Sequence, residues 1–234
     1  ITDDATFVIG QSPTADVRIG YCDEACHGDH AMKVENNSDA PGGLAQDGKH
    51  CFPGVTYTFG GKIKRVTGGA WLTVAIYKEG TTEDPVVTCA LCEVGDAYTQ
   101  VNAKFEVPEE GRYTFALLLP PHTTVICDDF TLIPSDSVRG FKRSAVEAGQ
   151  YVSPKVIRWP GGCGASFYNW RDGVGPDRPP MYSYFWGGYQ YNDIGTDELA
   201  TYAEAVGAES MICVNMFHPF KRFFDYVPPE SLKG

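Results

Sequence analysis

Basic residues are scarce in this chain. Its 19 lysines and arginines stand against 30 aspartates and glutamates, which leaves a formal net charge of −11 over 234 residues. Nucleic acids and anionic membranes bind clustered positive charge, so the composition argues against both as partners. Long apolar runs are also missing: no stretch approaches the roughly 18 residues that a membrane-spanning helix needs.

The first residues do not show the basic and then apolar layout of a signal peptide. We expect any such signal to lie outside this chain.

The excess of acidic residues is unevenly distributed along the chain. Residues 1–138 hold 9 basic and 20 acidic residues, a net of −11, whereas residues 139–234 hold 10 of each. This change predicts two domains, 1–138 and 139–234.

The first domain reads as nine short strands between residues 5 and 133, separated by turn residues. Strands at this spacing predict an all-β antiparallel sandwich of the jelly-roll type. Within residues 71–77, aliphatic side chains alternate with a second face that carries Trp71 and Tyr77. We expect that second face to be exposed and able to stack on sugars.

Six of the eight cysteines fall in the first domain, and three interpretations of them stay open. An even number favours disulfides, an oxidising compartment and a secreted protein, although sequence cannot choose among 15 pairings. Cysteine and histidine spacing also offers zinc ligands, and free buried thiols are the third reading. The residues concerned are Cys22, Cys26, His27, His30, Cys51, Cys89, Cys92 and Cys127.

The second domain changes to an α/β pattern. It predicts a helix over 140–150, a strand over 156–160, a helix that Thr196 caps and Gly207 ends, and a strand over 211–215. Helix, strand, helix, strand is typical of a parallel sheet, in which functional side chains follow the carboxyl ends of strands.

Four ordered stretches of this domain resemble glycoside hydrolase family 51, the α-L-arabinofuranosidases. They read VIRWPGGC at 156–163, FYNWRDGVGP at 167–176, NDIGTDEL at 192–199 and VGAESMICVN at 206–215. The VICDDFTL stretch at 125–132 is similar to the closing strand of the carbohydrate-binding-like domain that precedes the barrel in a subgroup of this family.

The resemblance implies a (β/α)8 TIM barrel and a retaining mechanism with two glutamates. A barrel needs about 250 residues, whereas 139–234 supplies 96. The family's acid/base glutamate follows an asparagine, and this chain has no Asn-Glu pair. We therefore expect an incomplete barrel without catalytic residues, inactive alone, whose remaining segments come from the same or another chain.

The resemblance also implies which residues line the sugar site. Arg158 would orient a catalytic carboxylate, Trp170 would stack on a pentose, and Tyr168, Asn169 and Asn215 would contact the sugar or its loop. Cys163 stands where the family often has a sugar-binding asparagine. The aromatic run at 181–191 would form one wall. The expected partner is an arabinose-containing polysaccharide or oligosaccharide.

Three further expectations concern the sandwich and the whole protein. Asp128 and Asp129, with Asp3 and Asp4, could supply oxygens for a structural calcium ion, and no other cofactor is expected. Asn36 begins a glycosylation sequon that we place in a surface turn. A non-catalytic carbohydrate-binding or structural extracellular glycoprotein is the alternative to an enzyme.

Overall fold

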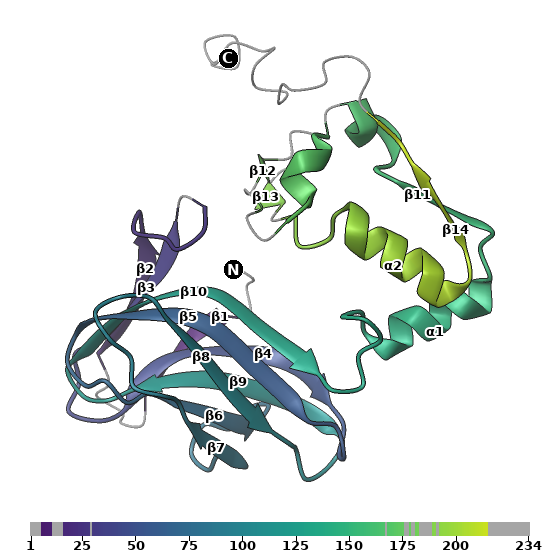
Figure 1. Ribbon diagram of the computed structural model, residues 1–234. Helices are drawn as coiled ribbons and strands as arrows, with labels where there is room; N and C mark the ends of the chain where they lie inside the picture. Colours follow the sequence, from purple (N-terminus) through teal and green to yellow (C-terminus); the bar gives the residue numbers. More distant parts are fainter. Residues whose placement is uncertain are drawn as a thin grey trace, which may run out of the picture. The chain divides into compact units, whose positions relative to one another are not determined.

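A computed structural model of the chain describes residues 6–10, 16–28, 30–166, 168–175, 178, 181–182, 189–190 and 192–214 (Figure 1). The chain forms two compact units, Ile1–Asp136 and Ser137–Gly234. Among the described residues, no helix has the length and apolar character needed to cross a membrane.

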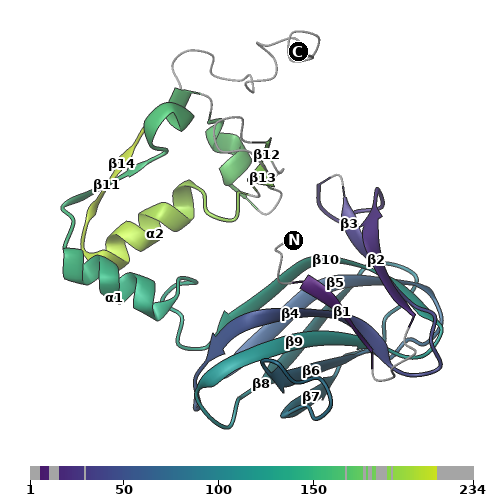
Figure 2. The same cartoon turned by 180° about the vertical axis from the view of Figure 1, so that it is seen from behind.

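The first unit is a sandwich of two five-stranded antiparallel sheets, which Figure 2 shows from behind. One sheet has the order β1 (Thr6–Gly10), β4 (Gly42–Cys51), β9 (Gly111–Leu119), β6 (Thr73–Lys78) and β7 (Val87–Ala90). The other has the order β2 (Val17–Cys22), β3 (Ala31–Asn36), β10 (Thr123–Pro134), β5 (Tyr57–Thr67) and β8 (Thr99–Phe105). The antiparallel sandwich predicted from the strand spacing is confirmed.

The core lies between these sheets and is built by alternate residues of both. Val74 and Ile76 of β6 face Val34, Ile63 and Val125 of the opposite sheet, and all five are at most 2% exposed. Removing this much branched aliphatic surface from water is the main stabilising contribution to the sandwich.

Strand β4 was missed by the sequence analysis, which expected nine strands and not ten. Its Asp47-Gly48 pair looks like a turn, but the structure places a β-bulge there, between Gln46 and Lys49, with Gly48 at φ +80°. Gly43 of the same strand lies so close to β9 that an added Cβ would fall 1.9 Å from the Leu117 carbonyl oxygen. Glycine here permits close strand packing and does not mark a loop.

The second unit is a small βα piece. Its elements are α1 (Arg143–Val152), β11 (Val156–Trp159), two short 3-10 helices (Gly162–Ser166 and Trp170–Gly173), β12 (Met181–Tyr182), β13 (Tyr189–Gln190), α2 (Thr196–Val206) and β14 (Glu209–Ile212). Strands β11 and β14 pair in parallel, as predicted. The described residues thus contain one two-stranded parallel sheet, and a TIM barrel is not seen.

Helix α2 ends as predicted but begins differently. Gly207 closes it at φ +77°, the left-handed conformation that favours glycine. The N-cap is Gly195, one residue before the predicted Thr196. Its N–H is satisfied from within the helix, because it donates to Glu198 Oε2 at 2.8 Å.

The disulfides favoured by the cysteine count are wrong. The seven cysteines whose side chains the structure describes are all free thiols: Cys22, Cys26, Cys51, Cys89, Cys92, Cys127 and Cys213. Strand register explains this, since the cysteines on paired strands face Ala31, Gly111, Val74, Met32 and Ile63, none of which can form a bridge. The expected secretion loses this support and stays a prediction.

Candidate functional site

The carboxyl ends of β11 and β14 lie side by side in the second unit. Arg158 pairs in register with Met211, and Cys213 N–H donates to the Trp159 carbonyl at 2.7 Å just beyond the paired residues. Arg158 is exposed, and its Nη2 lies 3.8 Å from the position that a Cβ on Gly161 would take. That distance is an ordinary van der Waals contact, so the guanidinium lies against the Gly161 backbone at the strand end.

The loop after β11 folds back onto the strand through two aromatic rings. Trp159 meets Tyr168 edge to face with centroids 5.6 Å apart, and Tyr168 is only 8% exposed. Burial raises the pKa of the Tyr168 phenol. A Cβ on Gly173 would lie 1.9 Å from the Tyr168 hydroxyl, so this packing requires glycine. Tyr168 therefore acts as loop core and offers little surface to a ligand.

Asn169 and Trp170 follow at the start of a 3-10 helix. The Asn169 side chain accepts from Arg171 N–H at 3.3 Å and donates to Asp172 Oδ1 at 3.2 Å. Both ends of this amide are engaged within the loop, so it caps the short helix. Trp170 is 49% exposed, and the Arg171 guanidinium lies 5.5 Å from its ring centroid. Among the loop side chains that the structure describes, Trp170 is thus the one that presents an aromatic surface.

An ion pair that the sequence analysis missed joins the loop to α2. Arg178 Nη1 and Nη2 each donate to one oxygen of Glu198 at 2.8 Å, and Arg178 Nε donates to the Gly175 carbonyl at 2.8 Å. The hydrogen bonds from Arg178 lower the pKa of Glu198, and those to Glu198 raise the pKa of Arg178. Because Arg178 and Glu198 are 20 residues apart, no local sequence pattern indicates that they pair.

Several predicted wall residues lie outside what the structure describes. They are the Cys163 side chain, Asn215 and most of the aromatic run at 181–191, where only the backbone of 181–182 and 189–190 is described. The structure therefore groups Arg158, Tyr168, Asn169 and Trp170 on one strand and its following loop.

Trp71 and Tyr77 do not form the exposed aromatic face that the sequence predicted on the sandwich. Trp71 lies before β6 and is 62% exposed, whereas Tyr77 on β6 has no exposed surface. Tyr77 packs in a second buried cluster with Ala45, Ala75, Ala116 and Leu118. A ring without exposed surface cannot stack on a sugar, so Trp71 stands alone.

Asn36 is not in a surface turn either. It is 1% exposed, and its Nδ2 donates to the carbonyls of Ala40, Leu119 and Pro120 at 2.9 to 3.1 Å. Its Oδ1 accepts from both N–H and hydroxyl of Ser38. The folded protein uses Asn36 to join β3 to the end of β9, which excludes it as an accessible glycan acceptor in that state.

Asp128 and Asp129 lie on β10 against the loop between β2 and β3. Asp128 Oδ2 accepts from the backbone N–H groups of Cys26 and His27, at 2.8 and 2.9 Å, and Asp129 pairs with His27 and Lys62. Asp3 and Asp4 lie outside the described residues. Calcium binding by these aspartates stays a prediction.

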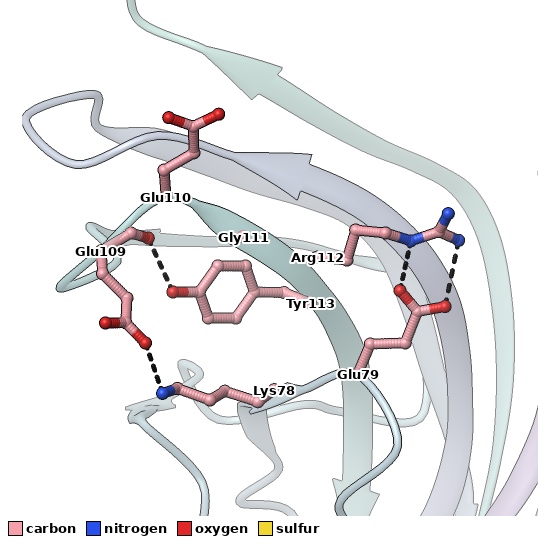
Figure 3. A pocket seen from close by; sticks show the side chains of 7 residues that line it. All are labelled: Lys78, Glu79, Glu109, Glu110, Gly111, Arg112 and Tyr113. Carbon is pink, nitrogen blue, oxygen red and sulfur yellow. Dashed lines mark hydrogen bonds and ion pairs between the residues drawn. The ribbon is translucent and has the colours of Figure 1, made fainter.

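A surface pocket lies at the ends of β6 and β9 (Figure 3). Its charged side chains pair with one another: Lys78 with Glu109, and Arg112 with Glu79. The Tyr113 hydroxyl donates to the Glu109 carbonyl at 2.8 Å. Because these charged side chains pair with one another, the pocket offers little unpaired polarity to a ligand.

Sequence comparison adds a relationship for the second unit. Residues 149–222 match the family model described as "Alpha-L-arabinofuranosidase 1 domain". Over 85 residues the chain is 39% identical to alpha-L-arabinofuranosidase C of Emericella nidulans and 38% identical to an intracellular exo-alpha-(1->5)-L-arabinofuranosidase of Halalkalibacterium halodurans. Each alignment covers 36% of this chain and 17% of the relative.

The solved structure of an arabinose-bound MgGH51 α-L-arabinofuranosidase is similar to this chain, with a TM-score of 0.73 over 89% of this chain and 37% of that chain. At 16% identity this likeness concerns the fold. Over residues 149–222 the chain is related to the α-L-arabinofuranosidases of glycoside hydrolase family 51. The family 51 resemblance of the four stretches is thereby confirmed, and Arg158, Tyr168, Asn169 and Trp170 all lie in the matched residues.

Proposed function

We propose that this chain is a portion of a retaining α-L-arabinofuranosidase-like glycoside hydrolase that acts on arabinose-containing polysaccharide, and that the chain alone is inactive. The observation that carries the proposal is the arabinofuranosidase match over 149–222, which includes the strand end and loop with Arg158 and Trp170. Function in a barrel enzyme is carried by such strand ends and loops.

An exposed apolar surface supports the idea of an incomplete barrel. Val156 of β11 and Met211, Ile212 and Val214 at β14 are 43 to 62% exposed. Parallel strands are normally covered on both faces. The missing cover would be the remaining strands and helices of a (β/α)8 barrel, from the same or another chain.

The chemistry needs groups that this chain does not supply. A retaining glycosidase uses two carboxyl groups about 5 Å apart, one as nucleophile and one as acid/base. The Asn-Glu pair expected for the acid/base is absent from the sequence. In the completed site Arg158 would keep a catalytic carboxylate ionised and oriented through its planar guanidinium, and Trp170 would stack on a sugar face.

The test is hydrolysis of an aryl α-L-arabinofuranoside. The 234-residue chain should give only the background rate, and adding a fragment with the later barrel strands should restore turnover that Arg158→Lys then lowers. Lysine keeps the charge but loses the planar fork. Turnover by the chain alone, abolished by replacing one of its own carboxylates, would contradict the proposal.

A non-catalytic carbohydrate-binding protein is the second candidate. The observation that favours it is the complete sandwich with the exposed ring of Trp71. Retention of the chain on immobilised arabinan that depends on Trp71 and not on Trp170 would support this candidate over the barrel site.

A further inference from the structure

The loop between β2 and β3 is tied to the sandwich surface by residues about 100 positions away. The backbone N–H groups of Cys26 and His27 both donate to Asp128 Oδ2, at 2.8 and 2.9 Å. Asp128 Oδ1 in turn accepts from Asp129 N–H at 2.9 Å. A carboxylate that accepts three N–H bonds is held firmly, and it fixes where the Cys26 and His27 side chains begin.

Asp129 occupies a β-bulge. The pairing of β10 with β5 shifts register between Asp128 and Thr131, and Asp129 has φ +53°. Bulges redirect side chains, and a left-handed backbone at a residue other than glycine is uncommon and costs free energy. Here the bulge directs the Asp129 carboxylate to the His27 ring, with which it pairs.

Three different ligand types thus converge. Cys26, His27 and Asp129 each offer one ligand atom, and these three atoms lie within 4.8 Å of one another. Sulfur, imidazole nitrogen and carboxylate oxygen are the donors that zinc takes, with bonds of about 2.0 to 2.3 Å. Calcium prefers oxygen alone, and Asp128, the other nearby carboxylate, is already engaged by N–H donors.

The same cluster already holds a positive charge. The Lys62 ammonium on β5 lies 3.4 Å from Asp129 Oδ2. The centre of the cluster therefore favours a cation. A divalent ion would replace one ammonium with a higher charge and direct bonds, and the flexible lysine stem allows its head to move to solvent.

We propose that Cys26, His27 and Asp129 bind one zinc-class divalent cation, with water as the fourth ligand. Asp128 positions the loop, and Lys62 is displaced when the ion binds. The ion would tie the loop between β2 and β3 to β10. This site lies in the first unit and is independent of the arabinofuranosidase chemistry proposed for the second.

The experiment titrates zinc chloride into the chelator-treated full chain, with calorimetry for stoichiometry and cobalt substitution for ligand identity. One zinc per chain is expected, together with a thiolate-to-cobalt charge-transfer band. Cys26→Ser and Asp129→Asn should each weaken binding by about tenfold to a hundredfold or more, since outer-shell changes alone cost that much. Lys62→Met should strengthen it, because the competing charge is gone.

Cys22→Ser is the matched control. Cys22 lies at the end of β2, and its Sγ faces the carbonyls of Glu24 and Ala31 at 3.8 and 3.7 Å, outside the cluster. Zinc affinity should not change in this variant. In the unmutated protein, zinc should also protect Cys26, but not the exposed Cys92, from alkylation, a readout that needs no variant to fold.

Three results would overturn the proposal. They are the absence of zinc binding, equal losses in Cys22→Ser and Cys26→Ser, and displacement of zinc by calcium at equal concentration. The first would leave the cluster as an ion-pair network around Lys62. The last would assign the site to oxygen ligands alone.

Discussion

The guanidinium of Arg178 and the carboxylate of Glu198 meet in a bidentate pair, with both N–O distances at 2.8 Å. Arg178 also donates to the Gly175 and Asn192 carbonyls, and Glu198 accepts from Gly195 N–H. One pair thus connects the long loop of the second unit to the first turn of α2. The paired side chains are 17% and 32% exposed, which limits screening by solvent.

Glu198→Gln should therefore destabilise the second unit. Glutamine keeps the size but loses the charge, and hydrogen bonds to charged groups contribute about 1.5 to 3 kcal/mol each; we expect a loss near 2 kcal/mol in the free energy of unfolding. The measurement is pulse hydrogen exchange of α2 peptides along a urea series. Glu204→Gln on the same helix is the control, because Glu204 is 71% exposed and pairs with Arg139 at the surface.

The same pair predicts a pH dependence. The folded-state pKa of Glu198 is lowered from its ordinary 4.5 by the Arg178 hydrogen bonds. Its contribution is therefore complete above that value and is lost as pH falls through the lower folded pKa. The stability difference between wild type and Glu198→Gln should shrink below about pH 4.5. A difference that stays constant down to pH 3 would assign the effect to packing.

Local patterns predicted most of the fold, and long-range contacts account for what they missed. Alternation and turn residues located nine of the ten sandwich strands, and Gly207 located the end of α2. The Asp47-Gly48 pair is typical of a turn, and only the pairing of β4 with β9 shows that the strand continues through it as a bulge. Tyr77 fits an exposed face by alternation, yet it is covered in the folded unit.

The candidate site follows the same division. Sequence similarity points to Arg158 and Trp170 as site residues because the family pattern is local, and their roles stay predictions. It could not show that Asn169 is engaged by its own loop, or that Arg178 reaches Glu198. Asn36 is the clearest case, since a three-residue sequon carries no information about the carbonyls of Leu119 and Pro120 that bury it.

Asn36→Ala should destabilise the sandwich strongly. The substitution removes the side-chain donor to the Leu119 and Pro120 carbonyls and the acceptor for Ser38, while the Ala40 carbonyl keeps the Ser38 hydroxyl as a donor. Each buried group left unsatisfied costs about 1 to 3 kcal/mol. We expect a loss of about 3 kcal/mol or more in urea unfolding of the full chain. Asn37→Ala is the matched control, because Asn37 is the exposed neighbour. Equal effects of the two changes would contradict the buried role of Asn36.

The thiols should differ widely in reactivity. Burial raises the pKa of Cys51 and of Cys127, which leaves little thiolate at pH 8, whereas Cys92 is exposed. Iodoacetamide labelling of the native chain, read by peptide mass spectrometry, should modify Cys92 first and the two buried thiols last. In denaturant the three rates should converge. A disulfide-linked peptide pair among the seven described cysteines would contradict the free thiols of the structure.

Trp170 should be the sugar-contacting ring if the family relationship extends to ligand binding. One side of its ring faces the Arg171 guanidinium, and the side chain is 49% exposed, so a face remains for a pentose. Stacking adds about 1 kcal/mol per ring, and an open half-site should bind no tighter than about millimolar.

Titration with arabino-oligosaccharides, followed through the indole N–H resonances, should move the Trp170 signal. Trp170→Ala should weaken binding by about fivefold, as that free energy implies, while Trp71→Ala changes nothing. Shifts confined to the Trp71 resonance, with binding lost in Trp71→Ala alone, would move the ligand to the sandwich and favour the carbohydrate-binding candidate.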